Sequence, residues 1–351
     1  MFKPTTRPSR ILAFALAFAV VGLAGAPVYA DDMLAADHPE HYTVRKGDTL
    51  WDIAGRFLRD PWRWPDIWYV NPQVSNPHLI YPGDELELVY IDGKPQLRVK
   101  RGPRVVKLSP EVRATPWDGS IPTVPVDAIA PFLSRPYVLS QEELDAAPYI
   151  VDFVDEHIIG GSGQGAYVRS IDAAEPKKFD VVRPGGPYKD ADTGEVLGYE
   201  AQYVGSSELQ RTGDPATVFL NRTQIEAIIG DRLLPVVGDE PISDFYPKAP
   251  ETEVKGSIIS VLNGVSQIGQ YNVVVLDRGA RDGLSPGTVL RVDQRGETIR
   301  DVVSKNPREK VTLPDEEAGL LMVFRTFDRV SFGLVMEATR AMHVLDRVRN
   351  P

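Results

Sequence analysis

The 351-residue sequence contains no cysteine, and this absence excludes several classes of protein at once. Without cysteine there can be no disulfide framework, no lipid-modified N-terminal cysteine and no thiolate nucleophile. Cysteine-dependent transpeptidases and papain-like endopeptidases are therefore excluded.

Histidine is also scarce, with five in the chain. A zinc peptidase or amidase needs closely spaced His and carboxylate ligands, yet the sequence has neither an HxH nor an HExxH pattern. Only His38 and His41 lie close together, ahead of the first predicted domain. We therefore expect no metal, no cofactor and no enzymatic activity. A cell-wall hydrolase that works with carboxylates alone stays open as an alternative.

Long apolar runs are limited to one, Ile11–Ala26, which follows three basic residues. The sequence VYA at 28–30 then has the small-x-Ala form of a secretory cleavage site. We predict a signal peptide over residues 1–30, an N-terminal tail over 31–41, and a mature chain without a transmembrane segment. Without the three basic residues of the leader, 36 basic side chains face 49 acidic ones, a formal charge of −13 that disfavours nucleic-acid binding.

The hydrophobic periodicity changes sharply within YTVRKGDTLWDIAGRF, residues 42–57. Its first residues alternate between apolar and polar, which predicts a short strand. Gly47 allows a turn, and the spacing of Thr49 and Asp52 predicts a capping box at the start of a helix. Apolar residues at helical spacing behind this cap predict one face on a core. They are Leu50, Ile53, Ala54 and Phe57.

A second motif, NPHLIYPGDELELVY at residues 76–90, follows a predicted second helix. Tyr81–Asp84 fits a type II turn, with Pro at its second position and Gly at its third. Leucines that alternate with glutamates then predict a strand. The predicted order over residues 42–90 is strand, helix, helix, strand.

These two motifs resemble the LysM module, a βααβ domain that binds glycans containing N-acetylglucosamine, such as peptidoglycan and chitin. The resemblance implies a shallow groove between the loop after the first strand and the loop before the second. Backbone groups of such loops match the amide and hydroxyl groups of a sugar. The implied glycan-binding residues are Gly47, Asp48, Thr49 and Leu50 in the first loop, and Asn76, Pro77, His78, Leu79, Ile80 and Tyr81 in the second.

Four of the five tryptophans lie within residues 51–68. A domain this small needs large rings to bury enough apolar area, so Trp51 and Trp68 are predicted to pack. Trp62 and Trp64 stay open between packing and stacking on a sugar.

Residues 91–136 are predicted to form a basic, Pro-rich linker, because eight prolines lie between Ile91 and Ser140. Seven basic and two acidic residues lie between Asp92 and Arg113. This charge fits either a solvated linker or contact with an anionic surface, such as peptidoglycan carboxylates or an acidic protein.

The remainder predicts mostly β structure in two related units, residues 137–247 and 254–351, each a sandwich or small barrel. Their matching ends, GDRLLP at 230–235 and LDRVRN at 345–350, lie 115 residues apart and suggest a duplication. The expected fold class is thus multidomain α+β: a small βααβ module followed by a mostly β region.

The leader, the single LysM motif pair, KLSP in the linker and DRGARDGLSPGTVLRV at 277–292 together resemble the LysM proteins associated with the type IV pilus secretin. In that family the C-terminal region is similar to the C-terminal domain of the flagellar assembly protein T. The resemblance implies a periplasmic, non-enzymatic protein that binds peptidoglycan and anchors the outer-membrane secretin to the wall. A generic wall-binding protein without a pilus role is the other alternative.

Overall fold

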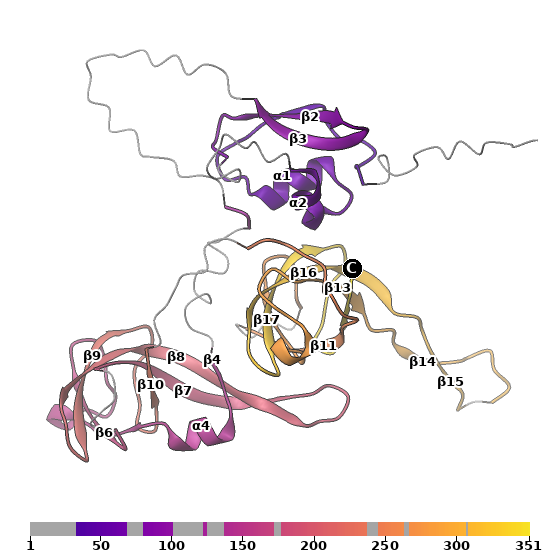
Figure 1. The fold of residues 1–351 in the computed structure, drawn as a ribbon. Coiled ribbons are helices and arrows are strands. Elements are labelled where there is room, and N and C mark those ends of the chain that lie inside the picture. The colour runs from indigo at the N-terminus through magenta and orange to yellow at the C-terminus, as the bar shows by residue number, and fades with distance from the viewer. Residues whose placement is uncertain are drawn as a thin grey trace, which may run out of the picture.

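The computed structural model describes residues 33–68, 80–100, 122–124, 137–171, 177–236, 245–262, 267–306 and 308–351. They form a small α/β module, a seven-stranded antiparallel sheet and a closed six-stranded barrel (Figure 1). This confirms the predicted fold class. The predicted signal peptide over 1–30 lies outside the described residues, as does most of the predicted linker.

The N-terminal module holds a three-stranded sheet in the order β1-β2-β3 beside two short helices. Strand β3 falls within the stretch predicted as linker, and it pairs with β2 from Ile91↔Lys94 to Glu85↔Lys100. The reason is a tight turn at Asp92 and Gly93, whose positive φ angles of 51° and 75° join two antiparallel strands. The elements are β1 (His41–Thr43), α1 (Leu50–Phe57), η1 (Pro61–Arg63), α2 (Trp64–Ile67), β2 (Glu85–Ile91) and β3 (Lys94–Lys100).

The core of this module contains the four apolar residues predicted from the helical spacing, Leu50 to Phe57, all buried. Trp68 packs in the same core, as predicted. Trp64 also packs there, with its ring centroid 6.0 Å from that of Trp68 in an edge-on arrangement. Trp62 instead packs, partly buried, against the second barrel. The structure thus gives packing roles to both rings that the sequence left open.

The first β unit is a sheet that closes on itself. Its strands follow the order β4-β8-β7-β10-β5-β6-β9, and β8 also pairs with β9, so β5 to β10 form a six-stranded barrel with β4 on its edge. The elements are β4 (Tyr137–Leu139), α4 (Gln141–Ala146), β5 (Tyr149–Phe153), η2 (Val154–Glu156), β6 (Gly165–Arg169), β7 (Lys178–Lys189), β8 (Val196–Arg211), β9 (Ala216–Thr223) and β10 (Arg232–Pro235).

The second β unit is a closed barrel in the order β11-β12-β17-β16-β13-β18. A separate two-stranded pair, β14–β15, is inserted between β13 and β16. The elements are β11 (Lys255–Val261), β12 (Val273–Leu276), η3 (Ala280–Asp282), β13 (Val289–Gln294), β14 (Thr298–Arg300), β15 (Lys310–Thr312), β16 (Glu316–Thr326), β17 (Ser331–Ala338) and β18 (Arg347–Arg349).

The two barrels share one topology, which confirms the two related units. Around the first barrel the strands follow the order β5-β6-β9-β8-β7-β10, and around the second they follow the order β11-β12-β17-β16-β13-β18. Strands at the same place in the two orders correspond, and every pairing in one barrel has its counterpart in the other. The matching sequence ends also have one local structure. Asp231 accepts a hydrogen bond from the N–H of Ile228 at 2.9 Å, and Asp346 accepts one from the N–H of His343 at 2.7 Å. Both carboxylates are buried and fix the turn before the last strand.

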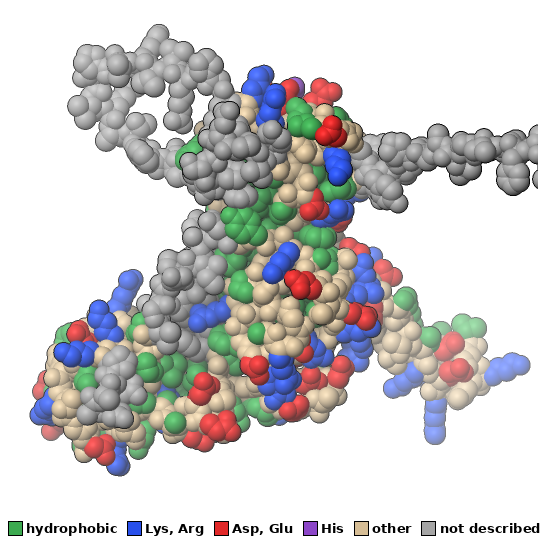
Figure 2. Space-filling model, viewed as in Figure 1, with side chains coloured by type: hydrophobic (Ala, Val, Ile, Leu, Met, Phe, Trp, Pro, Cys, Tyr) green, Lys and Arg blue, Asp and Glu red, His purple; other side chains and the backbone are tan. Residues whose placement is uncertain are grey.

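The second barrel is apolar on both sides of its wall. Along β12, Val274 and Leu276 belong to the interior cluster, whereas Val273 and Val275 belong to a second cluster on the outer face. Other parts of the chain cover this outer face: Trp51 of the module, Val124, Phe245, and Tyr188 and Leu197 of the first unit. Phe245 lies in the range predicted for the first unit, yet it packs on the second barrel. Figure 2 shows apolar side chains gathered where the module meets this barrel.

Candidate glycan-binding site

The ends of the two predicted sugar-binding loops lie side by side. Val44, which precedes the first loop, donates its N–H to the carbonyl of Asp84 at 2.9 Å and accepts the N–H of Gly83 at 2.8 Å. Gly83 has a φ of +95°, as the third position of a type II turn requires. Asp84 closes that turn by accepting the N–H of Tyr81 at 3.1 Å. The backbone therefore holds one edge of each loop against the other.

The first loop is closed by the side chain of Asp48. Its Oδ2 accepts hydrogen bonds from the N–H of Arg45 and from the hydroxyl of Tyr42, both at 2.8 Å. Burial and this hydrogen bond raise the pKa of Tyr42 above its usual value. Gly47 lies at the turn with a φ of +94°. It is exposed, and a Cβ added to it would meet no atom within 4 Å. A ligand can therefore approach the backbone at Gly47.

Thr49 and Leu50 have structural side chains. Thr49 is the N-cap of α1: its Oγ1 accepts the N–H of Asp52 at 3.1 Å, and the Asp52 carboxylate accepts the N–H of Thr49 at 3.2 Å. This confirms the predicted capping box. Thr49 is 4% exposed and Leu50 is 3% exposed. Only the backbone of these two residues is suited to contact a sugar.

The chain itself satisfies the backbone donors at the start of α1. The first N–H groups of a helix have no partner inside the helix. Here Leu50 donates to the carbonyl of Pro122 at 3.0 Å, and Trp51 donates to the carbonyl of Thr123 at 3.2 Å. Val124 is fully buried with Trp51 on the outer face of the second barrel. A segment of the predicted linker, Pro122–Val124, therefore covers the helix end of the first loop, and we call it the latch.

The second loop is described only in part. Asn76, Pro77, His78 and Leu79 lie outside the described residues. Ile80 is fully buried in the core of the module, whereas Tyr81 is partly exposed. Among the predicted site residues that the structure describes, Gly47, Asp48 and Tyr81 are thus accessible, and Thr49, Leu50 and Ile80 are buried.

A cleft of about 590 Å³ lies beside the first loop, between α1 and the second barrel. Arg56 is one wall residue, and its guanidinium lies 4.8 Å from the ring centroid of Tyr42. Glu337 of the barrel is another, and its pKa is raised by burial and by the neighbouring charges of Glu317 and Asp60. Sequence reasoning missed this cleft because its barrel side is more than 200 residues from α1. The lining residues are Asp48, Trp51, Asp52, Gly55, Arg56, Arg59, Pro61, Gln270, Met336 and Glu337.

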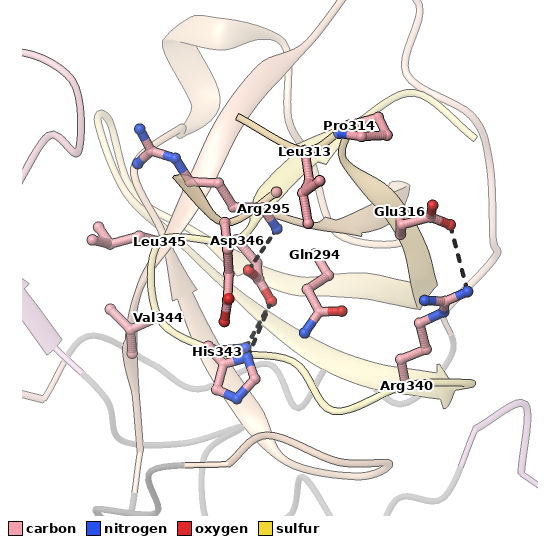
Figure 3. Close-up of a pocket in the computed structure, with 12 residues that line it drawn as sticks. Gln294, Arg295, Leu313, Pro314, Glu316, Arg340, His343, Val344, Leu345 and Asp346 are labelled. Atoms are coloured by element: carbon pink, nitrogen blue, oxygen red, sulfur yellow. Dashed lines mark hydrogen bonds and ion pairs between the residues drawn. The ribbon is translucent and has the colours of Figure 1, made fainter. Parts of the chain in front are cut away.

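A second hollow, of about 710 Å³, opens at one end of the second barrel (Figure 3). His343 is one of the residues that line it, and histidine is a common residue of catalytic and metal sites. Both oxygens of the buried Asp346 accept backbone N–H groups, from His343 at 2.7 Å and from Arg295 at 2.9 Å. Glu316 is paired with Arg340 at 3.4 Å. These interactions hold a turn and the wall of the hollow in place.

Metal-binding clusters and membrane-spanning helices are both absent from the part of the chain that the structure describes. Within it, no group of three or more His, Asp or Glu side chains could hold a metal ion. Of the helices in those same ranges, none is long and apolar enough to cross a membrane.

The strand, capped helix and paired loops define the class of the module. A LysM domain model matches residues 42–88, so this part of the chain is a LysM domain. A LysM domain implies binding to a glycan such as peptidoglycan or chitin and is typical of proteins associated with the cell wall outside the cytoplasm.

Part of the chain is similar to "Uncharacterized protein YqbP" from Bacillus subtilis (strain 168). It is 43% identical over 60 residues, which cover 14% of this chain and 27% of that protein. The chain therefore spans about a quarter of the relative that it matches.

Proposed function

We propose that this protein is a non-enzymatic, periplasmic peptidoglycan-binding protein that anchors the secretin of a type IV pilus to the cell wall. The observation that carries the glycan part is the LysM match over residues 42–88. The secretin part is supported by the sequence resemblance at residues 277–292 and by the order of one LysM domain followed by two β barrels.

The geometry supports weak rather than tight binding of a glycan. The accessible groups around the first loop are backbone at Gly47, the partly buried Asp48 and the ring of Tyr81. A shallow groove of this kind binds weakly, with a dissociation constant on the order of micromolar to millimolar. Secretins are ring-shaped homomultimers, so several copies on one ring would present several LysM domains to one polymer. Such multivalency raises the overall affinity by roughly 10² to 10⁴.

Affinity purification of the full-length protein from cell envelopes, followed by mass spectrometry, tests this proposal. We expect the secretin among the recovered proteins, and no cleared zone when the same protein is run on a zymogram containing sacculi. Recovery of sacculi without a secretin would instead support a generic wall-binding protein. A cleared zone that survives deletion of the LysM domain would identify a hydrolase.

A further inference from the structure

The two barrels differ in the segment that connects two equivalent strands. In the first barrel, β7 and β8 extend beyond the wall as one continuous hairpin, residues 184–201, which we call the first hairpin. In the second barrel, the connection from β13 to β16 contains the pair β14–β15, residues 296–314, which we call the arm. Because β7 corresponds to β13 and β8 to β16, the first hairpin and the arm occupy the same place in the topology.

The first hairpin binds to the second barrel through ion pairs at its tip. Asp190 lies 3.0 Å from Arg278, and Glu195 lies 2.6 Å from Arg329. Hydrogen bonds from Thr193, together with the pair to Arg278, lower the pKa of Asp190 to about 2. An acidic tip thus meets two arginines of the barrel.

Apolar contacts accompany these ion pairs. Tyr188 and Leu197, on the two strands of the first hairpin, are 6% and 8% exposed. Both belong to the apolar cluster on the outer face of the second barrel, which includes Val275 and Leu334. The face is therefore built to receive a hairpin.

The arm, by contrast, is exposed on both faces. All six residues of β14 and β15 are exposed, and Ile299 lies directly opposite Val311. At the tip, Val302 is 86% exposed and Val303 is 90% exposed. An isolated two-stranded ribbon is marginally stable in water, and exposed apolar side chains of this kind mark contact surfaces.

The arm also differs from the first hairpin in charge. Four basic residues and two acidic ones lie between residues 300 and 310. Figure 2 shows Lys and Arg side chains projecting from the arm. Asp301 is held by the N–H groups of Val303 and Ser304, and Glu309 accepts the hydroxyl of Ser304. The basic residues are Arg300, Lys305, Arg308 and Lys310.

The root of the arm leaves its own barrel over the hollow shown in Figure 3. Leu313 and Pro314 form one side of the hollow, and Val344 and Leu345 form the other. In Figure 1 the arm points away from both barrels. The first barrel of the same chain is therefore not its partner.

The first barrel has a face equivalent to the one that receives the first hairpin, with the charge reversed at two positions. The strand registers show which positions correspond. The pair Val168–Ala216 on β6 and β9 matches the pair Leu276–Ser331 on β12 and β17. By this register Asp214 stands in the position of Arg329, and Arg169 in the position of Asp277. Arg169 and Asp214 form an ion pair at 3.0 Å with side chains 53% and 55% exposed.

The same register places Tyr167 and Phe219 at the positions of Val275 and Leu334. Both aromatic residues are partly exposed. The first barrel thus offers an apolar surface beside the exposed Arg169–Asp214 ion pair, where the second barrel offers an apolar surface beside Arg278 and Arg329. A basic residue of the arm would compete with Arg169 for Asp214, and the apolar tip of the arm would cover the aromatic residues.

We propose that the arm of one molecule docks on this face of the first barrel in a second copy of the chain. In this contact the arm packs on a neighbouring molecule in the same way as the first hairpin packs on the second barrel of its own chain. Because each copy carries one arm and one receiving face at different places, the association is head-to-tail and builds a ring or an open filament.

Sedimentation velocity on the full-length mature protein tests the proposal with two defective variants. Val302→Asp combined with Val303→Asp places two charges on the apolar tip of the arm, which should prevent the arm from docking. Asp214→Arg reverses the charge of one residue on the receiving face, which should prevent that face from accepting an arm. The wild type is expected to associate with rising concentration, and each variant alone to associate at least about tenfold more weakly. An equimolar mixture of the two variants should form a 1:1 dimer and nothing larger, because only one arm and one face remain complementary.

Ile158→Asp is the matched control, since Ile158 is an apolar residue of the first barrel with the same 86% exposure as Val302. It should associate as the wild type does, and circular dichroism should be native for all variants. A wild type that stays monomeric at about 100 µM, well above the weak micromolar range, would overturn the proposal. So would a mixture that fails to dimerise, or loss of association in the control.

Discussion

Replacing Trp51 with alanine is expected to raise the affinity of the full-length chain for chitin oligosaccharides by about tenfold, a shift of about 1.4 kcal/mol. Trp51 is 5% exposed and packs with Val124 on the second barrel rather than in the core of its own module. Truncating a buried tryptophan costs about 3–5 kcal/mol. The loss should release the latch from α1 and free the N–H groups of Leu50 and Trp51 for a ligand. Isothermal titration calorimetry measures the change.

The isolated module, residues 33–100, is the control for this prediction. It lacks both the latch and the barrel, so the same substitution should leave its affinity unchanged and equal to that of the full-length Trp51→Ala variant. If the substitution lowers the affinity in both forms, Trp51 contacts the sugar directly. That outcome would contradict the idea that the latch limits access to the start of α1.

Replacing Gly205 or Gly319 with alanine is expected to destabilise the barrel concerned by about 2–4 kcal/mol. A Cβ on Gly205 would lie 2.4 Å from the carbonyl oxygen of Arg222, and one on Gly319 would lie 2.0 Å from that of Glu337. These are equivalent places in the two barrels, where one strand presses against the backbone of the next. Because the obstructing atoms are backbone, relief requires the strands to separate. Denaturant unfolding of each variant measures the loss.

Gly186→Ala is the matched control, because a Cβ at Gly186 would meet nothing within 4 Å. Its free energy of unfolding should change by less than about 0.5 kcal/mol. Equal stability of Gly319→Ala and the control would show that the close packing of β16 against β17 is wrong.

Local sequence signals predicted the LysM module well. The capping box of Thr49 and Asp52, the helical spacing of Leu50 to Phe57 and the type II turn at Tyr81 each depend on a few neighbouring residues, and the structure contains all three. The likeness of the two β units was also visible, because the same buried Asp stands before the last strand of each barrel. In both cases a short motif encodes one local conformation.

Contacts over long distances could not be predicted in this way. Strand β3 lies in a stretch that the sequence predicts as linker. It is a strand mainly because it pairs with β2, and local sequence signals do not reveal that pairing. The latch depends on two carbonyls about 70 residues beyond α1. The outer face of the second barrel is covered by four separate parts of the chain.

The most direct test of the anchoring role is the retention of the secretin ring on purified sacculi after detergent washing of envelopes. Cells would carry either the full-length protein or a variant lacking residues 42–100, which removes the LysM domain together with β3. We expect the ring to copurify with both proteins, and to stay on the sacculi only with the full-length protein. Equal retention of the ring with both proteins would contradict the anchoring role, because the LysM domain would then not be the link between the ring and the wall.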